Sequence, residues 1–539
     1  MAQQASAALV NADVITLDTK MPSASAVLVQ HGRIALVGES RQILEQVRGE
    51  EVVDLGGLTL VPGLVESHMH PSGLATALLE VDLRPGRVNC VQDILKAVRQ
   101  RTEKEPPGTW IRARGYDDTK LKERRHITRD ELDSVSSLHP VYVRRTCGHM
   151  GVANSMALRV SGVTQHTQDP PGGRIERSAE AGELTGLLLE QAQRLLSIPA
   201  YTEEQYVSGL EKALSVIGGW GLTTIHDMGV GRTVLGAYTR LLEKRRLTAR
   251  VRVWLSAERA DVLDDAMGLA SGEGCDMLKI MGMKFMLDGS VGGRSAALAQ
   301  PYAGDAHNRG ILYMNEEELA PRVLKCLRNG LRVGVHAIGE RAIEVCIRAF
   351  ESASDVIPLN TLRNMRNRIE HCALPTAEQV LRMKRLGLVA ASSTGFIHEL
   401  GDSYIQNLGS RVARAYPMST FLQYGIAAPG SSDCPVCNGN PFLGMGGAVT
   451  RKTQSGAIWD NSQNISALEA LSAYTTLGAY SALEEHSYGA IKKGMLGDMT
   501  LLSHNPLRAE PDAIKHIRAE MTFVGGVKVF DSSLGRPEW

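Results

Sequence analysis

The stretch LVPGLVESHMHPSG, residues 60–73, joins an apolar run to two histidines, His68 and His70, that are two positions apart. If the run is a β-strand, alternate side chains share a face, so both imidazoles point the same way and can hold one ion. The pair alone is weak evidence, because a chain with 15 His produces an HxH pattern by chance. Its meaning depends on the rest of the chain.

Strand-like runs alternate with amphipathic helical segments such as EEELAPRVLKCLRNG, residues 316–330, and TAEQVLRMKRLG, residues 376–387. This alternation is typical of a parallel sheet covered by helices. Eight parallel strands predict an α/β fold, a (β/α)8 TIM barrel, with a doubly wound sheet as the alternative. The eight predicted strands are residues 59–70, 139–150, 222–229, 278–289, 331–339, 366–374, 388–396 and 426–436.

The two ends of the chain differ from its middle. Residues 1–60 and 488–539 consist of short alternating runs separated by Gly, Asp and Pro, which predict a composite β-sandwich domain. Residues 61–487 form the predicted barrel. Two long insertions, 72–137 and 150–216, follow its first two predicted strands, and we expect both to act as lid-like elements that select the substrate.

Composition excludes several classes of partner. Lys+Arg and Asp+Glu both number 59, without long blocks of one sign, which argues against nucleic-acid or membrane partners. No long apolar run or basic leader is present, so we expect a cytoplasmic protein, a homo-oligomer, that acts on a small molecule. The eight Cys are scattered, and the Cys434-to-Cys437 CxxC has no second pair, which disfavours a disulfide framework and a four-sulfur zinc site.

Residue types that bind metals fall at the ends of the predicted strands, where a barrel places its chemistry. Nitrogen and carboxylate ligands without a thiolate suit Zn, and also Mn, Fe, Co or Ni. The set exceeds one open tetrahedral site, so we expect two divalent ions, which require a bridging anion. The candidates are His68, His70, Lys284, His336, His371 and Asp433.

Five ordered motifs resemble the amidohydrolase superfamily, in particular its amidohydrolase-3 or YtcJ-like branch. The resemblance covers nearly the whole chain, including the composite sandwich and the hairpin GGRIERSAEAGELTG, and it implies a metal-dependent hydrolase on a barrel fold. The motifs are GLVESHMH (63–70), MKFMLDGSVGG (283–293), VGVHAIGERA (333–342), RIEHCALP (368–375) and SSDCPV (431–436).

The resemblance also implies a role for each candidate ligand. In the family, the HxH pair and the last-strand Asp hold one ion, two later His hold a second, and a carboxylated Lys bridges the two. Matched to this chain, these are His68, His70 and Asp433 for the first ion, His336 and His371 for the second, and carboxylated Lys284 for the bridge.

Some neighbouring residues leave alternatives open. Lys279 competes for the bridge, but it is five residues from Lys284 and therefore lies on the opposite face of a regular strand. Glu66 replaces the Asp of many relatives. Because related branches use a Cys ligand, Cys372 or Cys434 in the metal site would change the assignment.

The predicted reaction is hydrolysis of a C–N bond in an amide-like small molecule, such as an N-acyl or N-formyl amine, by metal-bound hydroxide. Asp433 is the predicted general acid and base, and His149, at the end of the predicted second strand, is a candidate for binding the substrate carbonyl. A carbamate, ester or lactone hydrolase, or a non-catalytic regulatory protein on the same fold, is the alternative. His226 and Asp227 receive no role.

Overall fold

The computed structural model describes residues 6–178, 182–257, 266–537 and 539. The chain divides into two compact units, Met1–Leu74 with Leu210–Trp539, and Ala75–Gly209. The boundaries fall within helices α2 (Pro71–Leu79) and α6 (Glu203–Gly219). None of the helices among the described residues is long and apolar enough to cross a membrane.

The first unit contains a parallel barrel. Each strand pairs in parallel with its neighbour, and the segment 427–433 completes the ring. Ser392 pairs in parallel with Gly430, and the backbone N–H of Ser67 donates to Gly430 O on the other side. This confirms the predicted (β/α)8 fold class. Around the ring the named strands are β8 (Leu64–Met69), β15 (Leu222–Val230), β16 (Arg250–Ser256), β18 (Leu278–Met286), β19 (Arg332–Ala337), β20 (Arg368–His371) and β21 (Val389–Ala391).

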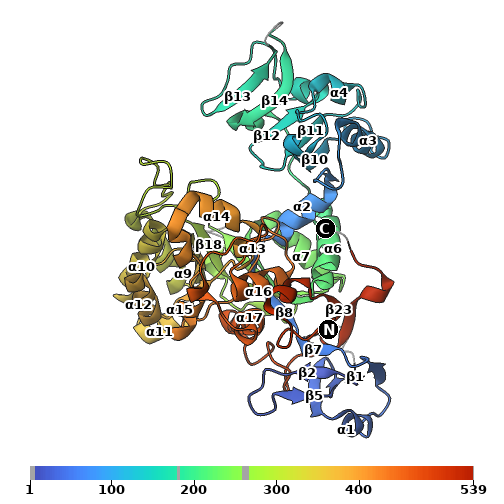
Figure 1. The fold of residues 1–539 in the computed structure, drawn as a ribbon, viewed down its shortest axis with the longest axis vertical. Helices are drawn as coiled ribbons and strands as arrows, with labels where there is room; N and C mark the ends of the chain where they lie inside the picture. Colours follow the sequence, from blue (N-terminus) through green and yellow to red (C-terminus); the bar gives the residue numbers. More distant parts are fainter. Residues whose placement is uncertain (1–5, 179–181, 258–265, 538) are drawn as a thin grey trace. The chain divides into compact units, whose positions relative to one another are not determined.

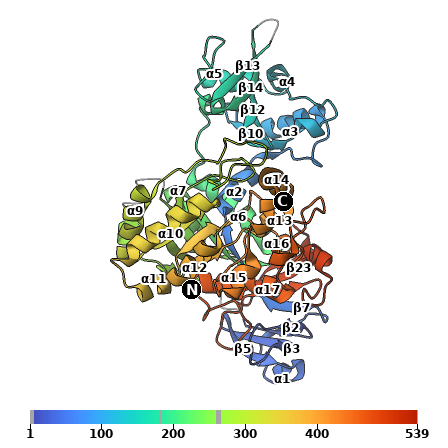
Figure 2. The ribbon, with the colours of Figure 1, turned by 60° about the vertical axis from the view of Figure 1, so that its left-hand side comes forward.

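Helices cover the barrel (Figures 1 and 2), and some of them have clear local start and stop signals. The Asn315 side chain caps α9, and Thr376 caps α12, which ends at Gly387 with φ 68°. The covering helices are α7 (Arg232–Glu243), α9 (Glu316–Arg328), α10 (Glu340–Ser354), α11 (Leu359–Met365), α12 (Ala377–Leu386), α13 (Gly395–Glu399), α14 (Gly401–Leu408), α15 (Met418–Gln423), α16 (Pro441–Thr450), α17 (Ala467–Ala473) and α18 (Thr476–Ser481).

Strands from both chain ends form two further sheets in this unit, as predicted for a small β-sandwich. The C-terminal β22 (Met499–Leu502) pairs antiparallel with the N-terminal β7 (Thr59–Pro62). One apolar core contains Leu9, Val14, Leu60, Leu501 and Phe523. One sheet has the order β5 (Arg33–Gly38), β4 (Ala26–Gln30), β1 (Ala7–Val10), β6 (Glu51–Asp54). The other has the order β24 (Val527–Asp531), β23 (Ala519–Val524), β22 (Met499–Leu502), β7 (Thr59–Pro62), β2 (Asp13–Ile15), β3 (Ser23–Ala24).

The second unit has its own mixed sheet and its own apolar core. Helices α3 (Val91–Thr102), α4 (Arg129–Asp133) and α5 (Ser155–Val160) belong to it. Its strands, in sheet order, are β13 (Gly173–Arg177), β14 (Leu184–Glu190), β12 (Met150–Ala153), β11 (Val141–Arg145), β10 (Ile111–Tyr116) and β9 (Val81–Asp82).

One predicted barrel strand was therefore wrong. Residues 139–150 contribute β11 to the second unit, and β16, which was not predicted, pairs with β15 and β18 in the barrel. The run RVRVWLS of β16 was missed because its arginines suggest exposure, yet Arg250 pairs with Asp498 and Arg252 with Glu484, and all four residues are buried. The two insertions expected at 72–137 and 150–216 are parts of one continuous unit, Ala75–Gly209.

Candidate metal centre

The six candidate ligands meet at the carboxyl ends of the barrel strands. The ring centroids of His68 and His371 are 4.6 Å apart, and those of His336 and His371 are 4.4 Å apart. Lys284 Nζ lies 3.3 Å from His68 Nε2, and Asp433 Oδ1 lies 3.1 Å from His70 Nε2. Residues from five separate strand ends, spread over more than 360 positions of sequence, therefore form one cluster.

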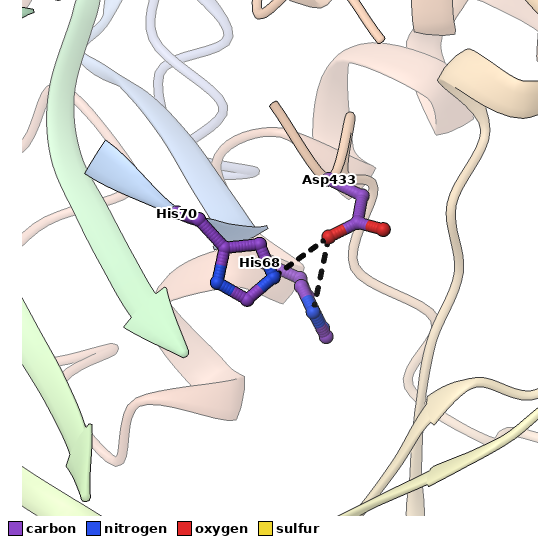
Figure 3. Close-up of side chains that lie close together, drawn as sticks. All are labelled: His68, His70 and Asp433. Atoms are coloured by element: carbon purple, nitrogen blue, oxygen red, sulfur yellow. Dashed lines mark ion pairs between the residues drawn. The ribbon is translucent and has the colours of Figure 1, made fainter. Parts of the chain in front are cut away.

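His68, His70 and Asp433 form the tightest part of this cluster (Figure 3). Their candidate ligand atoms all lie within 4.8 Å of one another, and Asp433 Oδ1 is 3.4 Å from His68 Nε2. Asp433 Oδ1 is buried, but it has no hydrogen-bond partner among the described residues. A buried carboxylate oxygen without a donor, facing two imidazole nitrogens, has the geometry and chemistry of a cation site. The residues therefore fit a divalent metal ion.

The protonation state of His68 also suits a metal ligand. Its Nδ1 lies 2.6 Å from Glu370 Oε2, so the proton resides on Nδ1 and the Nε2 lone pair faces the cluster. Burial holds the pKa of His68 well below its ordinary value. Burial, followed by His336, does the same for the pKa of His371. Both rings are thus neutral, the form that binds metal.

The two predicted ligands of the second ion each contact a polar atom outside the ligand set. His336 Nε2 lies 3.1 Å from Gly289 O, and His371 Nδ1 lies 2.7 Å from Ser393 Oγ. Lys284 is only 4% exposed and reaches the cluster from β18. Such partners outside the ligand set hold each ring in one orientation.

The competing Lys279 lies elsewhere. Its Nζ donates to Glu484 Oε1 at 2.6 Å, beside the guanidinium of Arg252. Five residues along the same strand, Lys284 reaches His68 instead. Of the two lysines, Lys284 is therefore the one that lies with the candidate ligands, as the strand period predicted.

Two of the candidate ligands lie on backbone that non-glycine residues rarely adopt. The φ angles are 66° at His371, 47° at its neighbour Cys372 and 57° at Asp433. Left-handed conformations of this kind cost about 1–3 kcal/mol each and concentrate at functional sites. Here they turn the chain at the carboxyl ends of two strands, so that His371 and Asp433 end in the cluster.

Glu66 has a structural role that its sequence position did not reveal. It is fully buried and accepts hydrogen bonds from the backbone N–H of His68 at 3.0 Å and from Ser432 Oγ at 2.8 Å. Burial raises the pKa of Glu66 to about 8. Glu66 thereby connects β8 to the segment that carries Asp433. In the sequence, this role was signalled by the Glu in the motif VESH, where many relatives have Asp.

Neither cysteine that could have changed the assignment enters the ligand group found among the described residues. Cys372 Sγ points to Met383 Sδ at 3.9 Å. Burial raises the pKa of the Cys434 thiol well above its ordinary value, which disfavours the thiolate that metals bind.

Three other residues that the sequence analysis singled out, His149, His226 and Asp227, lie in different surroundings. His149 belongs to the second unit, its side chain is 63% exposed, and its Nδ1 lies 3.0 Å from Glu190 Oε2. Because its predicted barrel strand was wrong, its contact with the substrate stays a prediction. His226 and Asp227 are fully buried on β15, where Asp227 accepts a hydrogen bond from Tyr238 at 2.8 Å.

Comparison with known proteins agrees with this geometry. The model of the Amidohydrolase family matches residues 51–530. The protein YtcJ of Bacillus subtilis (strain 168) is 28% identical over 521 residues, 94% of this chain and 96% of its own. The N-substituted formamide deformylase of Arthrobacter pascens is 27% identical over 545 residues, 98% of each chain.

A solved structure shows the same likeness in three dimensions. The uncharacterized metal-dependent hydrolase from Pyrococcus furiosus superimposes with a TM-score of 0.77 at 27% identity, covering 93% of this chain and 100% of its own. The matched residues include the barrel and all six candidate ligands, and they begin at β6, after the first five N-terminal strands. The chain therefore belongs to the amidohydrolase family and is a metal-dependent hydrolase of carbon–nitrogen bonds.

Proposed function

We propose that this enzyme hydrolyses the C–N bond of a small, uncharged N-acyl or N-formyl amine with two divalent cations. The observation that carries the proposal is the convergence of His68, His70 and the donorless Asp433 Oδ1, next to His336 and His371. The similarity to an N-substituted formamide deformylase over 98% of the chain supports an amide-like substrate.

Six residues would hold the two cations. When bound, the cations supply Lewis acidity, which polarises the scissile carbonyl and acidifies a water molecule. Zinc suits these nitrogen and oxygen donors, as do Mn, Fe, Co and Ni. We propose His68, His70 and Asp433 for the first cation, His336 and His371 for the second, and Lys284, carboxylated on Nζ, between them.

Asp433 would carry the proton during turnover. Asp433 is 8% exposed as a residue, and its carboxylate has an oxygen without a hydrogen-bond donor, so it can accept the proton of the attacking water. The same carboxyl group then donates this proton to the leaving nitrogen, which makes the amine a better leaving group. General acid–base catalysis of this kind contributes about 10²- to 10⁴-fold.

Metal analysis and a substrate screen test the proposal together. Protein purified without chelator and loaded with Zn or Mn should bind about two ions per chain. N-formyl and N-acyl amines should be hydrolysed faster than matched carbamates, esters and lactones. Saturation at one ion would contradict the two-cation site, and a preference for esters or lactones would contradict the amide-like substrate.

A further inference from the structure

A buried ion pair on β20 lies directly behind the candidate metal centre. Arg368 Nε donates to Glu370 Oε1 at 2.7 Å, and Arg368 Nη2 donates to Glu370 Oε2 at 2.7 Å. Both residues have no exposed surface. Because they are two positions apart on one strand, both side chains project into the barrel interior. The pair is therefore bidentate and shielded from solvent, the geometry in which an Arg–carboxylate pair is strongest.

The same carboxylate contacts a candidate ligand from another strand. Glu370 Oε2 lies 2.6 Å from His68 Nδ1, across 302 positions of sequence. A carboxylate paired with a guanidinium is a hydrogen-bond acceptor, so His68 Nδ1 must donate. This contact fixes one tautomer and one ring orientation. The Nε2 lone pair of His68 is left facing Asp433 Oδ1 at 3.4 Å.

Arg368 is itself held in place by groups outside the pair. Its Nη2 donates to Ser67 O at 2.7 Å, and its Nη1 lies 3.0 Å from His226 Nδ1. Trp254 Nε1 also donates to His226 Nδ1, at 3.2 Å, and the guanidinium lies 4.9 Å from the Trp254 ring centroid. The guanidinium therefore has few alternative positions, and this restraint extends through Glu370 to His68.

We propose that Glu370 and Arg368 are positioning residues for the metal ligand His68. The inference rests on the metal site of the proposed function, and it assigns roles to two residues outside the set of six candidate ligands. Glu370 keeps the His68 proton on Nδ1 and increases the basicity of Nε2, while Arg368 holds the Glu370 carboxylate. Partners of this type typically change metal affinity by about 10- to 100-fold when they are removed.

The test compares two buried carboxylates of the same barrel. Glu370→Gln removes the charge behind His68, whereas Glu484→Gln removes the charge of a second buried Arg–Glu pair, in which Arg252 donates to Glu484 at 2.5 and 3.1 Å. Glu484 also accepts hydrogen bonds from Lys279 and Tyr488, and neither these residues nor Arg252 belongs to the proposed set of six ligands. Each variant is stripped of metal and titrated with Zn against a chromophoric chelator, and the Tm of the metal-free form is recorded.

Glu370→Gln should weaken Zn binding by about 10- to 100-fold, and Glu484→Gln should lower the metal-free Tm without changing Zn affinity by more than about twofold. Equal losses of affinity in the two variants, or wild-type affinity in Glu370→Gln, would overturn the inference. If Glu370→Gln does not fold, Arg368→Lys takes its place, because Lys retains the charge but not the bidentate geometry. Failure of the wild-type protein to bind divalent cations would instead contradict the proposed function.

Discussion

Asp433 combines two proposed roles in one side chain, ligand and proton carrier. Asp433→Asn keeps an oxygen that can coordinate a cation, but an amide cannot accept and return a proton at neutral pH. We expect a folded protein with much of its metal and a kcat reduced by at least about 10²-fold. Metal content and kcat are measured on the same preparation. A kcat close to wild type would remove Asp433 from proton transfer.

Lys284 and Lys279 allow a matched comparison on one strand. Lys284→Ala removes the proposed bridge and should abolish metal binding and activity, and acetate or bicarbonate should partly restore both by supplying an anion. Lys279→Ala breaks a pair with Glu484 and should retain its metal content. Metal content and activity with and without acetate are the readouts. The opposite pattern in the two variants would place the bridge at Lys279.

Glu399, which is not a candidate metal ligand, should make the stability of the protein depend on pH. Burial raises its pKa from the ordinary 4.5 to about 7. Between these values the folded state holds a proton that the unfolded state releases, so its contribution to stability is complete below pH 4.5 and is lost as pH rises through about 7. The Tm of wild type relative to Glu399→Gln should therefore fall across this window. Metal binding shifts the Tm of wild type and of Glu399→Gln alike, so it cancels in their difference. Tm curves of the two proteins that run parallel across this pH range would contradict the raised pKa of Glu399.

At the level of elements, one carboxyl group adds side-chain hydrogen bonds to the backbone contacts that close the barrel. Glu66 on β8 accepts hydrogen bonds from the N–H of Ser432 at 3.1 Å and from its hydroxyl at 2.8 Å. Glu66→Ala would leave these buried donors unsatisfied, at about 1–3 kcal/mol each. We expect a lower Tm for Glu66→Ala and a smaller loss for Ser432→Ala, which removes only the hydroxyl. Equal Tm values for wild type and Glu66→Ala would contradict this closing role.

Whether a segment forms a strand or a helix was predictable wherever the signal lies within the segment itself or directly beside it. The run around His336 is short and largely apolar, and the run around His371 precedes the capped helix α12, so β19 and β20 were predicted close to their positions. The run of β16 was not, because a strand that contains Arg250 and Arg252 becomes a core strand only when distant carboxylates neutralise them. The apolar run of β11 fits either sheet equally well, since periodicity does not specify which sheet a strand joins.

At the scale of the whole molecule, the C-terminal strands complete a sheet that begins at the N-terminus. Deleting residues 498–539 removes β22, β23 and β24 and exposes Leu60 and its neighbours in the shared core. We expect aggregation or a large loss of soluble yield, because this apolar surface would face water. Deleting only 532–539, which lie beyond the last strand, is the control. A monodisperse, metal-binding product of the longer deletion would show that the barrel does not need this sheet.

The fold class, the pairing of the two chain ends and the six candidate ligands could all be predicted from the residues alone. These follow from local periodicity and from motifs at strand ends, which a linear chain displays directly. Which strand fills each place of the ring, and which groups support the ligands, became clear only from the folded chain. Glu370 and His68 are 302 positions apart, and Glu66 and Ser432 are 366 apart. Contacts of that kind depend on how distant strands come together, and no periodicity within either segment encodes them.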